Sequence, residues 1–118
     1  MLIQQQDKNH VTVLGLMSGT SHDGLDLCIC KFWKNTHWQY DILYTKHVPY
    51  EYDFKQSLIT AFSKPIDEIN ALHVTFGEFL AHEAKVCIEE SGIVTDLIAS
   101  HGHTIFHQPQ NGFTLQIG

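Results

Sequence analysis

The stretch GLMSGTSHDGLD, residues 15–26, has a composition that could hold an anionic ligand. Gly19 and Gly24 could adopt positive φ, and their missing side chains would let a ligand approach the backbone. Consecutive backbone N–H groups in such a turn form a concave anion site, to which Ser18, Thr20 and Ser21 would add hydroxyl donors. The stretch could therefore be a phosphate-binding loop, but a plain hairpin turn uses the same residue types, and on composition alone we favour the hairpin turn.

Two carboxylates in this stretch suggest a metal. Asp23 and Asp26 carry the same sign of charge as phosphate, so they would lie near one only with a cation between them. Mg²⁺ fits, because it takes oxygen ligands and usually keeps several waters. The stretch is not a Walker A loop, since it has no GK[ST] sequence and no predicted helix follows it.

A second polar stretch is SHGHTIFHQP, residues 100–109. His101, His103 and His107 share parity on an extended chain, so they could bind Zn²⁺, although Gly102 suggests a turn that would spoil the parity. The alternative is a polar rim at the carboxyl end of a strand, where α/β sheets bind their ligands. On that interpretation the histidines and Thr104 contact a substrate, which we favour over a purely structural role and over a metal site.

The composition excludes several classes of partner. A formal net charge of −6 argues against nucleic acid or an anionic membrane as the main partner. No apolar stretch reaches the length of a spanning helix, and the N-terminus lacks the order of a signal peptide. We interpret Cys28, Cys30 and Cys87 as reduced thiols of a cytosolic protein, acting as small buried residues.

The hydrophobic pattern predicts a single domain of the α/β class with a mixed sheet, in the order β-β-β-α-α-β. Short links between the first three strands make them antiparallel neighbours. The longer helix has a periodic apolar stripe, with Gly92 as its stop signal, and this stripe predicts core. The expected elements are strands at 11–17, 25–33 and 37–48, helices at 51–62 and from about Pro65 to Ser91, a buried strand at 95–99 parallel to the first, and extended pieces around 105–107 and 113–117 with a turn at 109–112.

The end of the sequence suggests a truncated domain. FTLQIG is an apolar strand without a charged tail or a capping element. Such a terminus would leave the edge of a sheet unprotected. We therefore expect the chain to be cut before the natural end of its domain.

Together these stretches resemble one family. GLMSGTSHDGLD is similar to the N-terminal block of the anhydro-N-acetylmuramic acid kinases, and IASHGHTIFHQP with FTLQIG is similar to their second block. The two blocks occur in the expected order and at compatible spacing. Residues 33–94, between them, fit the family only in pattern.

The resemblance implies a fold and an activity. The family has the actin-like, hexokinase-like ATPase fold (ribonuclease H-like), with two lobes and the nucleotide in the cleft. The resemblance therefore implies that residues 1–118 are the N-terminal lobe of a longer, two-lobe protein. Its members are cytoplasmic and typically homodimeric. With ATP and Mg²⁺ they phosphorylate O6 of 1,6-anhydro-N-acetylmuramic acid recovered from peptidoglycan, while water opens the anhydro ring. The product is N-acetylmuramic acid 6-phosphate.

The resemblance also implies roles for individual residues. His101, Gly102, His103 and Thr104 would lie by the sugar, with Asp23 and Asp26 near Mg²⁺ bound to ATP. The catalytic general base, an aspartate, would follow Gly118, so these 118 residues alone should be inactive. The implied nucleotide loop is Gly19, Thr20, Ser21, His22, Asp23, Gly24, Leu25 and Asp26.

Two departures from the family pattern leave other functions open. His22 stands where the family usually has an apolar residue, and His103 where it usually has glutamine. Histidine would keep a hydrogen bond but change its geometry and pH dependence. One alternative is a non-catalytic remnant or binding module of the same fold. The other is a zinc hydrolase that uses His101, His103 and His107.

Overall fold

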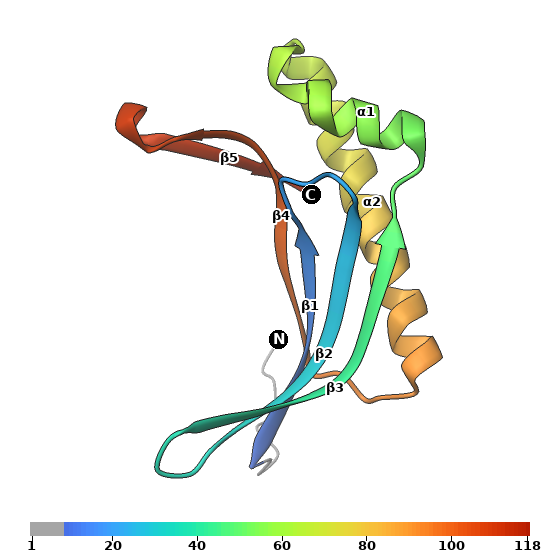
Figure 1. The fold of residues 1–118 in the computed structure, drawn as a ribbon, viewed down its shortest axis with the longest axis vertical. Coiled ribbons are helices and arrows are strands. Elements are labelled where there is room, and N and C mark those ends of the chain that lie inside the picture. Colours follow the sequence, from blue (N-terminus) through green and yellow to red (C-terminus); the bar gives the residue numbers. More distant parts are fainter. Residues whose placement is uncertain (1–8) are drawn as a thin grey trace.

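The computed structural model describes residues 9–118, which form a five-stranded mixed sheet with helices on one face (Figure 1). The α/β class with a mixed sheet is confirmed. The strand order is β3-β2-β1-β4-β5, in which β1 and β4 are parallel and the other neighbours antiparallel. The strands are β1 (His10–Ser18), β2 (Gly24–Lys34), β3 (Trp38–Pro49), β4 (Leu97–Gln108) and β5 (Phe113–Ile117).

The helices follow the predicted ranges closely. They are α1 (Tyr52–Thr60), continued by a short 3₁₀ turn at Ala61–Ser63, and α2 (Ile66–Ser91). Pro65 precedes α2, and Asp67 and Glu68 place negative charge in its first turn, where the helix dipole favours it. Gly92 ends the helix in the left-handed region at φ 66°, and its N–H donates to the carbonyl of Ile88. None of the helices in residues 9–118 has the length and apolar character needed to span a bilayer.

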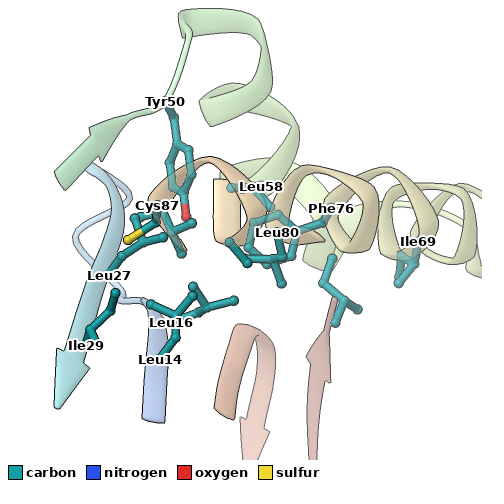
Figure 2. Packing of buried hydrophobic residues seen from close by; sticks show 13 residues of the cluster. Leu14, Leu16, Leu27, Ile29, Tyr50, Leu58, Ile69, Phe76, Leu80 and Cys87 are labelled. Carbon is teal, nitrogen blue, oxygen red and sulfur yellow. The ribbon is translucent and has the colours of Figure 1, made fainter. Parts of the chain in front are cut away.

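The core lies between α2 and one face of the sheet (Figure 2). Alternate residues of β1 and β2 point toward the helix, and the apolar stripe of α2 meets them, as the period of its sequence predicts. Tyr50, just after β3, brings an aromatic ring into the same cluster beside Phe54, Phe76 and Phe79. The buried members are Leu14, Leu16, Leu25, Leu27, Ile29, Tyr50, Leu58, Ile69, Phe76, Leu80, Ala84, Cys87 and Ile117.

The three cysteines are free thiols, and two of them are buried. Cys87 lies in the core beneath the sheet, where burial raises the pKa of its thiol. Cys30 is also buried, and its pKa is raised for the same reason, with Cys28 contributing. Cys28 itself is only half-buried, so the prediction of buried thiols holds for two of the three.

Strand β4 corrects two predictions. The expected strand at 95–99 and the extended piece around 105–107 are one continuous strand, because Gly102 adopts φ 73° and lets the chain bulge without turning back. The first residues of β4 are also not buried, with Leu97 50% and Ile98 55% exposed. Ile98 lines an open groove beside Leu80 and Ala84 of α2, because the helix does not close over this part of the sheet.

Candidate functional site

The loop of residues 19–23 joins β1 to β2 at the end of the sheet where α1 lies (Figure 1). The N–H of His22 donates to the carbonyl of Gly19 at 3.3 Å, which closes the turn. The residue with positive φ is His22, at 57°. The expectation that Gly19 and Gly24 adopt positive φ is wrong, because a histidine takes the left-handed position that one of them was expected to fill.

The two glycines of the loop have different surroundings. A Cβ atom on Gly24 would lie 2.3 Å from the carbonyl oxygen of Val48 and 2.8 Å from Nε2 of His47. The missing side chain of Gly24 therefore makes room for the neighbouring strand β3. A Cβ on Gly19 would meet nothing within 4 Å, so Gly19 leaves its backbone open to an approaching ligand. Leu25, the next residue of the predicted loop, is fully buried in the core.

The two carboxylates of the predicted metal site have different neighbours. Asp23 is 68% exposed and lies 3.9 Å from the ammonium group of Lys55 on α1. Oδ1 of Asp26 lies 2.7 Å from Nδ1 of His47, its cross-strand neighbour on β3. Within residues 9–118, no three or more His, Cys, Asp or Glu side chains gather in a metal-binding group. Asp26 is as exposed as Asp23, at 70%, but Asp23 is less closely engaged, because Lys55 lies 3.9 Å from it and His47 only 2.7 Å from Asp26.

Ser18, just before the 19–23 loop, contacts His103 of the SHGHTIFHQP stretch. Ser18 lies opposite His103 in the register of β1 and β4, where the ladder is irregular, and its Oγ is 2.8 Å from Nδ1 of that histidine. His103 is buried, and its Nε2 has no hydrogen-bond partner among the described residues. Burial, and after it the nearby His22 and His101, lower the pKa of His103 to about 4. The imidazole is therefore neutral near pH 7.

The exposed side of the same block carries a polar row. Nε2 of Gln116, on β5, lies 3.2 Å from Nε2 of His101 and donates to Oγ1 of Thr104 at 3.3 Å. Gly102 permits the close approach of the two strands, since a Cβ there would lie 2.6 Å from the carbonyl oxygen of Ile117. Sequence reasoning missed Gln116 as a site residue, although it lies within the FTLQIG motif and shares a strand register with Thr104.

The histidines of the zinc hypothesis do not come together. His103 is buried against Ser18, His101 contacts Gln116, and Nδ1 of His107 lies 3.1 Å from Oγ1 of Thr114 farther along the hairpin. The bulge at Gly102 breaks the parity on which the hypothesis depended. With no metal-binding group of three among residues 9–118, the zinc site is not supported.

Comparisons with known proteins agree on one family. The family model described as anhydro-N-acetylmuramic acid kinase matches residues 11–118. The curated protein named anhydro-N-acetylmuramic acid kinase from Pseudoalteromonas translucida is 36% identical to this chain over 121 residues. The match covers 90% of this chain and 30% of that relative. The relative from Pseudomonas putida is 38% identical over 111 residues, covering 89% and 30%, and that from Synechococcus elongatus 34% over 117 residues, covering 90% and 30%. The chain spans about 30% of the length of these relatives.

Proposed function

Because the chain belongs to the anhydro-N-acetylmuramic acid kinase family, we propose that the complete protein is an ATP-dependent kinase of 1,6-anhydro-N-acetylmuramic acid. By complete protein we mean the product of the whole reading frame that contains this chain. The reaction transfers the γ-phosphoryl group of ATP to O6 of the sugar. Water adds at C1 and opens the 1,6-anhydro bridge, which gives N-acetylmuramic acid 6-phosphate for reuse in the cytoplasm.

The observation that carries the proposal is the meeting of the two sequence blocks. Ser18 and His103, 85 positions apart, lie within hydrogen-bond distance of one another. The ring of His22, in the 19–23 loop, also lies 5.0 Å from the ring of His103, so the loop contacts the block that contains His101 and Thr104. A kinase needs this arrangement, because the phosphoryl donor and the acceptor hydroxyl must lie in line at a short distance.

The residues of the loop would bind the nucleotide. The open backbone at Gly19 and the hydroxyls of Thr20 and Ser21 offer hydrogen-bond donors to the phosphates. The exposed carboxylate of Asp23 would hold the Mg²⁺ that accompanies ATP, directly or through water. Asp26 is the second candidate, and it would have to share its carboxylate with His47.

The residues of the second block would bind the sugar. His101 and Thr104 face outward beside Gln116 and present ring nitrogen, hydroxyl and amide groups to a polyhydroxyl ligand. Gly102 sets the bulge that turns His101 outward and His103 inward, so His103 would support the site from behind. The general base, an aspartate, is proposed to come from the part of the protein that follows Gly118, and a homodimer stays a prediction.

The proposal is tested by incubating the complete protein with ATP, Mg²⁺ and 1,6-anhydro-N-acetylmuramic acid. We expect one ADP and one 6-phosphorylated, ring-opened sugar per turnover, followed by phosphorus and carbon NMR. A protein that binds ATP or the sugar but forms no phosphorylated product would instead be a binding module of the same fold. A protein that hydrolyses ATP without using the sugar would have a different acceptor.

Replacing Asp23 by asparagine should weaken the use of MgATP. Asparagine keeps the shape of the side chain but removes the charge that attracts Mg²⁺, so we expect KM for MgATP to rise by about tenfold. KM for the sugar should change much less, because the sugar is proposed to bind at the other block. Steady-state kinetics with each substrate varied in turn would measure both constants.

The matched control is Asp41→Asn, which makes the same change on β3 far from the loop, opposite Lys31 of β2. It should leave both KM values unchanged. Equal increases for the two substrates in Asp23→Asn would contradict a role for Asp23 in holding the metal.

A further inference from the structure

Tyr50 contacts both ends of the 19–23 loop. Its backbone N–H donates to the carbonyl of Asp23 at 3.3 Å, at the end of the loop. Its hydroxyl lies 2.5 Å from Oγ of Ser18, at the start of the loop. These two contacts come from one residue, so the distance between the ends of the loop depends on where Tyr50 lies.

The ring of Tyr50 is anchored in the core. Its side chain extends from the end of β3 into the buried cluster (Figure 2). It makes edge-to-face contacts with Phe54, Phe76 and Phe79, at ring-centroid distances of 5.4, 6.4 and 5.8 Å. Aromatic pairs of this geometry are favourable and directional, so they fix where the hydroxyl lies. The position of the loop is thereby tied to the packing of α1 and α2.

Ser18 connects this hydroxyl to His103. A neutral imidazole, one serine proton and one tyrosine proton allow two directions for the chain of hydrogen bonds. If Tyr50 donates to Ser18 and Ser18 donates to Nδ1 of His103, only the N–H at Nε2 lacks a partner. The reverse direction would also leave the proton of Tyr50 without one among the described residues. The first direction therefore costs less.

From these contacts we propose that Tyr50 is a positioning residue that clamps the 19–23 loop, with Ser18 and His103 as the arm that ties the loop to β4. On the β2 side, β1 stays in register as far as the pair of Ser18 and Leu25, whereas on the β4 side the register shifts between Leu16 and Ser18. The side-chain bonds of Ser18 therefore add to the strand ladder on the side where it is irregular. The kinetic part of this inference rests on the proposed function, whereas the structural part does not.

The experiment compares Tyr50→Phe with Tyr44→Phe in the complete protein. Tyr50→Phe keeps the ring and the backbone N–H but removes the bond to Ser18. Tyr44→Phe is the matched control, because it removes a hydroxyl that donates to Glu90 from β3, the strand just before Tyr50, away from the loop. The amides of His22 and Tyr50, which close the turn and hold its end, report directly on the loop by hydrogen exchange.

We expect Tyr50→Phe to speed exchange of these two amides by about tenfold, the effect of one lost hydrogen bond, while Tyr44→Phe leaves them unchanged. In the kinase assay KM for MgATP should rise by a similar factor, with little change in KM for the sugar. Exchange at His22 and Tyr50 that matches the control would overturn the clamp. Faster amide exchange spread evenly over β1, β2 and α2 would also overturn the clamp, because that pattern indicates general destabilisation.

Two further outcomes separate the clamp from the proposed function. If the unaltered protein has no kinase activity, the proposed function fails, and the exchange experiment still decides whether Tyr50 holds the loop. If the kinase is active and Tyr50→Phe loosens the loop without changing KM for MgATP, the loop is clamped but does not bind the nucleotide. That result would overturn the kinetic part of the inference alone.

Discussion

Gly24→Ala should destabilise the complete protein by at least about 3 kcal/mol, near the top of the usual range for overpacked substitutions. The added methyl would lie 2.3 Å from the carbonyl oxygen of Val48. That carbonyl belongs to the strand pair in which Leu25 faces Val48 and Gly24 faces Pro49. It cannot retreat without breaking the ladder between β2 and β3. Chemical denaturation, or the yield of soluble protein if folding fails, would measure the effect.

Gly19→Ala is the matched control, because it makes the same change five positions earlier in the same loop. A methyl at Gly19 would meet no atom within 4 Å, and its φ lies outside the positive range that strains other residues. The free energy of unfolding should therefore stay within about 0.5 kcal/mol of the original. KM for MgATP should nevertheless rise, because the methyl would occupy space proposed for phosphate. A stable Gly24→Ala variant that fails only to bind ATP would contradict this division between the two glycines.

Patterns that depend on near neighbours were predictable from the sequence. The alternation of residues in β1 and β2 and the apolar stripe of α2 follow from the periods of strand and helix, and the apolar residues of the stripe are buried in the core or pack against it. Gly92 marks the end of α2 because a left-handed residue is needed there. The contact between the GLMSGTSHDGLD stretch and the SHGHTIFHQP stretch could be expected only because both stretches resemble blocks of one family.

Features that depend on distant contacts were not predictable. Gly102 indicated a break, yet a bulge at one residue let β4 continue, since β5 pairs with the second half of the strand. Gly24 was interpreted as room for a ligand, but the space is filled by β3. Tyr50 has no local signal of its role, because its partners Ser18 and Asp23 lie on another part of the chain.

The buried His103 should make stability depend on acid pH. Its pKa is lowered from 6.5 to about 4 in the folded state, first by burial and then by His22 and His101. In the unfolded chain the imidazole takes a proton as the pH falls below 6.5, whereas in the fold it stays neutral until about pH 4. Between these values the unfolded state binds more protons, so acid favours unfolding. The shift corresponds to roughly 3 kcal/mol, lost progressively through this window and fully retained above it.

His103→Gln isolates this effect from the other histidines. Glutamine keeps an amide that can bond Ser18 but has no proton to gain in this range. We expect the free energies of unfolding of the two proteins, measured in urea, to differ by a constant amount above about pH 7 and to diverge toward about pH 4, with the original protein losing more. Parallel curves would mean that His103 is accessible to solvent or gains a partner on protonation. A protonated His103 would donate to Ser18 and no longer accept from it, which reverses the chain of hydrogen bonds. The proton of Tyr50 would then lack a partner among the described residues, so loosening of the 19–23 loop should accompany the loss of stability.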